Sequence, residues 1–279
     1  MSKLLHANFL RLGKDKYFWI GMIAMILYGA ISCVGQYRNL KVYETSVTFD
    51  SVFFGSHVII GMLIAAFCSL FVGTEYSDGT IRNKLMVGCS RRDIYLSNFI
   101  TCAAAGALMS FAYMFTACIV GIPLFGFFEM EWQTVVVYVL DGLLMVIALA
   151  AVFSMLSMLN QNKTLVAVIS MAGIFALLFF TLYITMKLGE PELFDGVTMS
   201  KTVGDTVTQT IEKIPNPMYL SPSQRSFYQF LYDFIPTGQG IQISAGAVTH
   251  PCAAGLYSAG ITAAANLAGI WGFNRKDLK

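Results

Sequence analysis

The 279-residue sequence contains few residues whose types and spacing would support catalysis or metal binding. No metal-ligand spacing relates the three histidines, His6, His57 and His250, and neither HExxH nor GxSxG occurs. A nucleotide-binding GxxxxGKS or GxxxxGKT loop is also absent, because the one Gly-Lys pair, at 13–14, continues into Asp15. We therefore expect no metal site and no cofactor on this chain.

One carboxylate, Asp141, lies inside a long apolar run. An ionised side chain at the centre of a membrane helix costs roughly 2.5–3.5 kcal/mol on insertion scales, so Asp141 should face protein or a water-filled cavity. It either lines a substrate path or holds a neighbouring helix through a polar contact. We favour packing, because no basic residue is clearly placed to complete a relay. A membrane enzyme that uses Asp141 is less favoured, since catalysis needs several convergent groups.

The most polar short stretch between apolar runs is GTEYSDGTIRNKLMVGCSRRDIYLSNF, residues 73–99. Ser77 or Asp78 can cap a first short helix, and Gly88 is well placed to end it. Ser90 then begins a capping box with Asp93 that opens a second helix. The sequence thus predicts a rigid helix–break–helix rather than a flexible tether.

The first of these helices carries both apolar and polar side chains. Its apolar strip consists of Ile81, Leu85 and Met86. The polar side chains expected to point outward are Tyr76, Arg82, Asn83 and Lys84. Such a segment suits docking into a groove on a soluble partner, whose movement a rigid loop would transmit to the adjoining spans. The alternative is an ordinary cytoplasmic loop, which is also polar and basic.

The composition places these residues in a polytopic α-helical membrane protein. Apolar residues make up 56% of the chain, charged residues only 12%, and the mean hydropathy is +0.65. Each apolar run is near the roughly 20 residues that cross about 30 Å of hydrocarbon. We expect a single transmembrane domain, residues 1–279, with six spans at about 18–36, 53–74, 98–122, 134–158, 164–186 and 252–273.

Basic residues set the orientation of these spans. Twelve of the 18 Lys and Arg residues fall in the terminal segments, the 73–99 loop and the connection at 159–163. Since cytoplasmic loops carry an excess of Lys and Arg, we expect both termini to be cytoplasmic. Residues 2–16 are too polar to cross, and their spacing predicts a helix in the inner membrane interface, although a frayed basic tail fits the pattern as well.

The long connection at 187–251 holds six of the seven prolines and is expected to lie outside. We predict a small extracellular cap, followed by one or two re-entrant helices that dip into the outer leaflet. Its aromatic residues Phe227, Tyr228 and Phe230 are dense enough to shape an outer gate or contact an amphipathic substrate. Packing within the cap and the interface belt is the default interpretation.

Small residues recur every four positions along the last span, at Gly260, Ala264, Ala268 and Gly272. Such a stripe permits close helix approach. Packing within the chain is the favoured use, and a dimer contact is the alternative.

The 73–98 segment resembles the loop after the second span in permease subunits of type 2 ABC exporters, in particular the bacitracin/lantibiotic-type bacterial group. In that family an acidic residue, a Gly-Thr-Ile-Arg run and a Ser-Arg pair recur in the same order. Six spans, the FIPTGQGIQI stretch and the basic ending FNRKDLK are similar as well. The resemblance covers nearly the whole chain, but only the loop is specific, and the 187–251 region is longer than a minimal member needs.

The resemblance implies an ATP-driven permease of the bacterial cytoplasmic membrane that exports amphipathic substrates, such as peptide antibiotics, lipids or drugs. Residues 75–97 would then form the coupling loop for an ABC ATPase subunit, present in two copies, and that partner subunit would bind the ATP and Mg²⁺. A second permease copy, identical or related, would complete the pathway within membrane lipid, and no nucleic acid is expected. The residues that inherit the docking role are Glu75, Tyr76, Asp78, Gly79, Thr80, Ile81, Arg82, Asn83, Ser90 and Arg91.

A competing hypothesis is a non-transporting membrane sensor or immunity protein that captures an antimicrobial at its extracellular loop. It predicts that protection depends on that loop and does not depend on an active ATPase partner.

Overall fold

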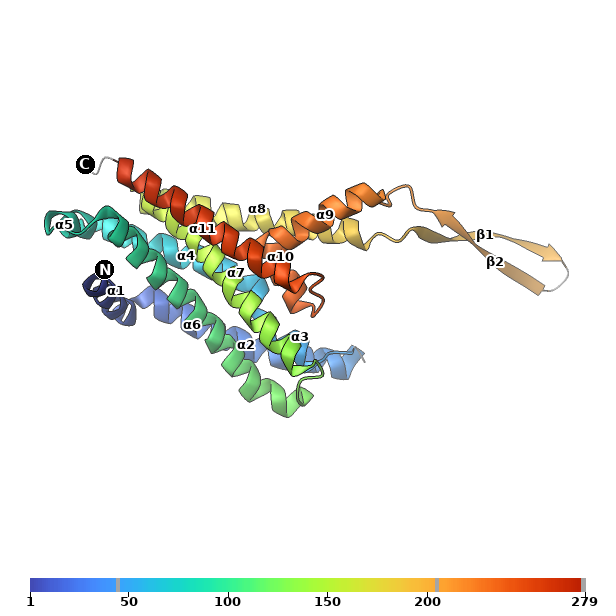
Figure 1. Cartoon of the computed structure of the whole chain (residues 1–279). Coiled ribbons are helices and arrows are strands. Elements are labelled where there is room, and N and C mark those ends of the chain that lie inside the picture. The colour runs from blue at the N-terminus through green and yellow to red at the C-terminus, as the bar shows by residue number, and fades with distance from the viewer. Residues whose placement is uncertain (44–45, 204–205, 277–279) are drawn as a thin grey trace.

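The computed structural model describes residues 1–43, 46–203 and 206–276 (Figure 1). Its first half contains α1 (Ser2–Lys14), α2 (Lys16–Tyr43), α3 (Phe49–Phe53), α4 (Ser56–Ser77), α5 (Thr80–Met86) and α6 (Arg91–Phe125). Its second half contains α7 (Trp132–Leu159), α8 (Lys163–Gly189), β1 (Leu193–Val203), β2 (Thr206–Pro215), α9 (Pro222–Phe234), α10 (Pro236–Ser244) and α11 (Pro251–Arg275).

Within the described residues, six helical segments are long and apolar enough to cross a membrane. They are α2, α3 with α4, α6, α7, α8 and α11. The predicted class, a six-span α-helical membrane protein, is confirmed to this extent. The helices extend beyond the predicted spans, because helical hydrogen bonding continues past the apolar residues that mark the hydrocarbon region.

The bundle is built around α4 and α7. More than half of the most apolar window of each is buried, against 28% for α2, α8 and α11. α11 packs along α7, α2 packs along α6, and α4 lies between α7 and α8. The outer helices therefore present most of their apolar side chains outward, as expected of surfaces that face lipid.

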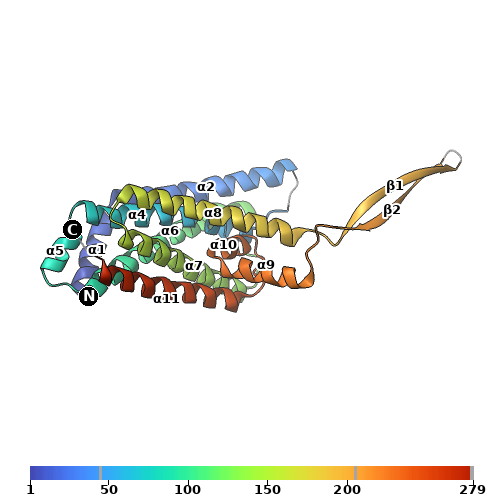
Figure 2. The ribbon, with the colours of Figure 1, turned by 90° about the horizontal axis from the view of Figure 1, so that it is seen from above.

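The two ends of the bundle differ (Figures 1 and 2). α1, α5 and the C-terminal end of α11 lie together at one end, which we call the terminal end. β1 and β2 project beyond the helices at the opposite, or hairpin, end. They form one antiparallel ribbon that pairs Leu193 with Pro215 and Val203 with Thr206.

The 187–251 region thus contains a β-ribbon and two helices. Ser221 caps α9 through a capping box with Gln224, and Pro236 starts α10 immediately after the break at Ile235. α10 packs against α4 so closely that a Cβ on Gly240 would lie 2.6 Å from the carbonyl oxygen of His57. A side chain at this position would therefore push α10 away from α4. Whether α9 and α10 enter the outer leaflet stays a prediction.

The contact stripe on α11 differs from the predicted one. Gly260, Ala264 and Ala268 are exposed, and Gly272 is only half-buried. The buried small residues are instead Ala254, Gly255, Ser258, Ala265 and Gly269. The prediction of intra-chain packing was wrong for the first three positions. Rows spaced strictly by four residues drift around a helix of 3.6 residues per turn, so the row facing α7 and α6 alternates steps of three and four.

Two matched substitutions test this stripe. Gly269 lies directly against the buried Tyr95 ring, whereas a Cβ on Gly260 would meet nothing within 4 Å. We expect Gly269→Leu to cost about 1–3 kcal/mol of stability through overpacking. Gly260→Leu should leave the thermal midpoint of the detergent-purified protein unchanged or raise it, because leucine has the higher helix propensity. The reverse order of midpoints would contradict the observed stripe.

Candidate functional site

The turn between α4 and α5 depends on a glycine. α4 continues to Ser77, and the chain reverses at Gly79, whose φ of 66° lies in the left-handed region that favours glycine. The prediction that Ser77 or Asp78 caps α5 was wrong, because Gly79 occupies the N-cap position without a side-chain hydrogen bond. The reason is that α4 remains helical through Ser77, and Asp78 forms its C-cap.

The other end of α5 follows the prediction in that Gly88 comes just after the helix and Ser90 caps the next one, but of the predicted capping box only the bond to the Ser90 side chain is found among the described residues. α5 ends at Met86, and Gly88 follows with a φ of 89°. Ser90 then caps α6, its side chain accepting a hydrogen bond of 3.1 Å from the backbone N–H of Asp93. α5 is therefore a short rigid helix held between two defined turns.

Glu75 is the centre of a buried polar cluster behind α5. Only 2% of its side chain is exposed. Arg11 and Lys84 both form ion pairs with its Oε1 atom, and the Asn98 amide donates to Oε2 at 2.8 Å. Lys84 also donates to Asn8 Oδ1 at 3.1 Å. We call these five residues the Glu75 cluster.

The Glu75 cluster joins four helices. Asn8 and Arg11 come from α1, Glu75 from α4, Lys84 from α5 and Asn98 from α6. The sequence assigns Glu75 to docking and points Lys84 outward, but the structure buries Glu75 and turns Lys84 toward it. Sequence reasoning missed Asn8, Arg11 and Asn98. The sequence signal that could have indicated the two α1 residues is the polar and basic face of this amphipathic helix.

A second set of contacts ties α11 to the same loop. Tyr76 donates a hydrogen bond to the Met158 carbonyl, and Lys276 donates to the Tyr76 hydroxyl at 3.1 Å. Arg91 donates to the carbonyls of Phe273 at 2.9 Å and Lys276 at 2.5 Å, at the C-terminal end of α11. Tyr76 and Arg91, which the sequence assigns to docking, thus contact this chain itself.

The remaining docking candidates divide by exposure. Asp78, Arg82, Asn83 and Ser90 are exposed. Thr80 donates to the Glu75 carbonyl at 3.1 Å, and Ile81 is 1% exposed, so the predicted apolar strip packs inward at Ile81. Met86 and its neighbour Val87, which the prediction omitted, are 77% and 84% exposed. We call the surface formed by Arg82, Asn83, Met86 and Val87 the α5 tip.

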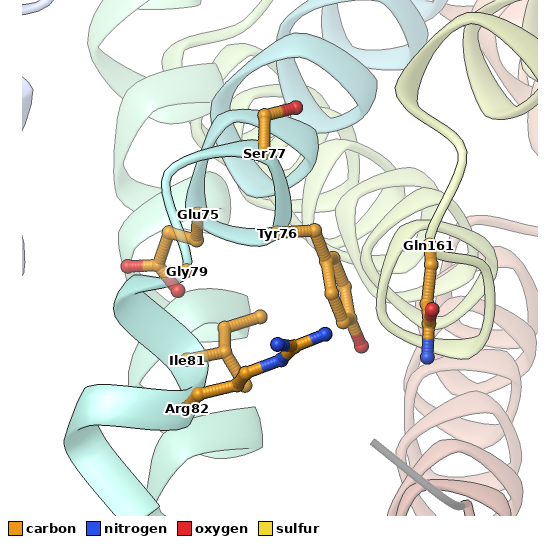
Figure 3. Close-up of a pocket in the computed structure, with 7 residues that line it drawn as sticks. All are labelled: Glu75, Tyr76, Ser77, Gly79, Ile81, Arg82 and Gln161. Atoms are coloured by element: carbon orange, nitrogen blue, oxygen red, sulfur yellow. The ribbon is translucent and has the colours of Figure 1, made fainter. Parts of the chain in front are cut away.

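A cavity of about 140 Å³ lies between the α4–α5 turn and the connection from α7 to α8 (Figure 3). Its walls are formed by Glu75, Tyr76, Ser77, Gly79, Ile81, Arg82 and Gln161. The Glu75 carboxylate points away from Arg82, whereas the Arg82 guanidinium lies beside the Tyr76 ring and extends toward Gln161. The cavity therefore presents a cation beside two polar side chains.

The other predicted site residues lie elsewhere. Asp141 on α7 is 7% exposed and lies against Gly255 of α11. Its Oδ2 atom has no hydrogen-bond partner among the described residues. Phe227 and Phe230 on α9 are exposed, and Tyr228 is half-buried against Tyr183. Asp141 thus lies at a helix–helix contact, and its carboxylate forms no hydrogen bond with the described residues. Its assignment to helix packing rather than a substrate path stays a prediction.

Comparison with known proteins places the chain. Residues 4–194 match the model of a family described as ABC-2 family transporter protein. This chain belongs to the ABC-2 family. The matched region runs from α1 to the start of β1, and so includes the Glu75 cluster and the α5 tip. No curated protein matched the chain.

The ABC-2 family assignment and the six apolar helices agree on a multi-pass membrane transport component. Membership implies association with an ABC ATPase, and components of this kind are generally not catalytic themselves. The broad part of the predicted resemblance, a type 2 ABC permease, is thereby confirmed.

Removing the buried charge of Asp141 is not expected to destabilise this ABC-2 protein, because its Oδ2 atom has no hydrogen-bond partner among the described residues. An unpaired buried charge is costly, so Asp141→Asn should leave the thermal midpoint in detergent unchanged or raise it. The exposed Asp78→Asn serves as the control. A fall of more than about 2 kcal/mol in the free energy of unfolding would show that the carboxylate has a stabilising partner.

Proposed function

We propose that this ABC-2 protein is the transmembrane permease subunit of an ATP-driven exporter, with a separate ATPase subunit docking on the α5 tip. The observation that carries the proposal is the attachment of α5. An exposed, partly apolar helix projects at the terminal end while its inner face is fixed to α1, α4 and α6 by the Glu75 cluster. Tyr76 and Arg91 extend this attachment to α7 and α11.

The arrangement suits transmission of force. A docked ATPase that moves α5 would pull on buried charged groups, whose separation is costly, rather than on a flexible tether. The moved helices would then include α4 and α6 directly and α11 through Arg91 and Lys276. The remaining machinery is two ATPase copies and a second permease copy, identical or related.

The finer assignments follow from the resemblance to bacitracin/lantibiotic-type permeases. We infer that the protein lies in a bacterial cytoplasmic membrane with the terminal end inside. Its substrates would be amphipathic, such as peptide antibiotics, lipids or drugs. Under this orientation α1 is an interfacial helix, and the β-ribbon with α9 and α10 forms the extracellular part.

The test uses exposed residues, because Ile81 is buried and its replacement would disturb α5. Met86→Asp and Val87→Asp should abolish co-purification with the ATPase subunit and ATP-dependent transport, while thermal midpoints stay at the wild-type value. Met218→Asp, at the hairpin end and 61% exposed, is the matched control and should retain both activities. Normal co-purification and transport in both α5 variants would remove the proposed docking site.

A second candidate function is a non-transporting sensor or immunity protein. It is favoured by the β-ribbon, which projects beyond the helices at the hairpin end (Figure 2). Deleting residues 193–215 would then abolish protection against an antimicrobial, while a hydrolysis-deficient ATPase partner would not. The exporter proposal requires that the inactive ATPase abolishes protection.

A further inference from the structure

Among the described residues, no carboxylate balances the positive charge of Arg82 in the cavity under the α5 tip. No carboxylate of the described residues forms an ion pair with Arg82, which extends across the cavity in Figure 3. The one carboxylate in the cavity wall, Glu75, is already shared by Arg11 and Lys84. The Glu75 carboxylate is therefore already paired with Arg11 and Lys84. The Arg82 guanidinium faces the cavity without an ion-pair partner among the described residues.

A second cation, Lys276, lies against Tyr76. The Lys276 ammonium sits 4.3 Å from the centre of the Tyr76 ring and donates to its hydroxyl and to the Met158 carbonyl. Burial lowers the pKa of Lys276 to about 8. An anion bound close to the Tyr76 hydroxyl would favour the protonated amine, because an opposite charge nearby raises the pKa of an amine.

The volume of the cavity and its position in the structure indicate which kind of group can bind there. A volume of about 140 Å³ accommodates one polar side chain and not a large molecule. Ile81 and Arg82 of α5 line the cavity, and α5 is the outermost element at the terminal end in Figure 1. The exposed Met86 lies one helical turn from Arg82 on the same helix. A protein that docks on the α5 tip therefore brings its side chains to Arg82.

We propose that the cavity receives an aspartate or glutamate side chain of the ATPase subunit, and that Arg82 binds its carboxylate. The planar guanidinium of arginine can hold a carboxylate through two parallel N–H···O bonds, which fixes orientation as well as adding affinity. This inference rests on the proposed docking function. It adds a charged socket in the permease to the apolar contact made by Met86 and Val87.

The test measures binding of the purified ATPase subunit to the full-length permease in nanodiscs of neutral phosphatidylcholine. We expect Arg82→Glu to weaken binding by at least about 100-fold and Arg82→Gln by about tenfold, on the scale of lost charge-assisted hydrogen bonds. Arg82→Lys should recover only part of the affinity, because an ammonium lacks the planar fork. Asn83→Glu, the same charge placed on the adjacent exposed residue, should have a smaller effect.

A suppressor experiment identifies the partner group. In a library of single Asp→Arg and Glu→Arg changes across the ATPase, at least one should restore binding of Arg82→Glu and weaken binding of the wild-type permease. Since Arg82 is exposed, all its variants should keep the wild-type thermal midpoint. Rescue at one carboxylate supports the inference, and no rescue at any position overturns it.

The outcomes separate this inference from the proposed function. Loss of binding in Met86→Asp with wild-type binding in Arg82→Glu would overturn the charged socket alone. Wild-type binding in all the α5 variants would remove the docking proposal and the socket with it. An Arg82→Glu defect that appears only in phosphatidylglycerol nanodiscs would assign the cavity to a lipid phosphate and overturn the protein ligand.

Discussion

Glu75→Ala is expected to lower the free energy of unfolding by about 3–5 kcal/mol, the cost of removing one partner from a buried ion pair. The reason is that Arg11 and Lys84 both neutralise the single Glu75 carboxylate, so its loss leaves two cations in a largely dry site. The Asn98 amide also loses its 2.8 Å acceptor. Chemical or thermal unfolding of the purified protein in detergent measures the change.

The control for Glu75→Ala is Asp78→Ala, which removes an exposed carboxylate from the same turn. It should change the stability by no more than about 0.5 kcal/mol. The double variant Glu75→Leu with Lys84→Met should be less destabilised than the sum of its single variants, because no unpaired lysine remains. Equal effects of Glu75→Ala and Asp78→Ala would show that the Glu75 cluster does not hold the terminal end together.

A functional readout distinguishes the Glu75 cluster from the α5 tip. A variant that weakens the cluster without unfolding the bundle, such as Lys84→Met, should still bind the ATPase, because Met86, Val87 and Arg82 are unchanged. It should transport poorly, since α5 would move without pulling α4 and α6. The opposite pattern, lost binding with intact transport, is incompatible with the proposed transmission.

The membrane spans could be predicted from sequence because each is a long run of apolar residues that are consecutive in the chain. Some twenty consecutive apolar residues leave few alternatives to a membrane helix. The start of α6 was accessible for a similar reason, since Ser90 and Asp93 lie within one turn. In contrast, the role of Glu75 depends on Arg11 and Asn98, which are distant in the chain, so residue types alone did not separate an exposed acid from a buried one.

Two other features show where local patterns mislead or were overlooked. The four-residue repeat on α11 looked like a contact stripe, but the face that packs is fixed by Tyr95 and the α7 surface. Strands β1 and β2 were not predicted, although the Val-, Thr- and Ile-rich sequence at 197–211 carries a strand signal. Residues 204–205, which separate the two strands in the sequence, lie outside the described residues.

The second large effect is expected at the hairpin end, from Asp233→Ala. Asp233 is 5% exposed, and its carboxylate joins three segments. Oδ2 lies 2.9 Å from His250 Nδ1 just before α11, and Oδ1 accepts from Gln229 of α9 at 2.9 Å and from Gln242 of α10 at 3.0 Å. Removing it leaves the buried Gln242 amide short of an acceptor, which should cost about 2–4 kcal/mol on the scale of hydrogen bonds to charged groups.

The experiment compares Asp233→Ala with Glu192→Ala, which removes an exposed carboxylate near the same end. We expect only the Asp233 variant to lose thermal stability in detergent. Because the α5 tip is at the far end of the bundle, binding of the ATPase should persist in both variants, whereas transport should fall in Asp233→Ala as α9 and α10 lose their attachment to α11. If Asp233→Ala transported normally with a lowered thermal midpoint, the junction of α9, α10 and α11 would be structural only. If it abolished ATPase binding as well, the two ends of the bundle would not behave as separate units.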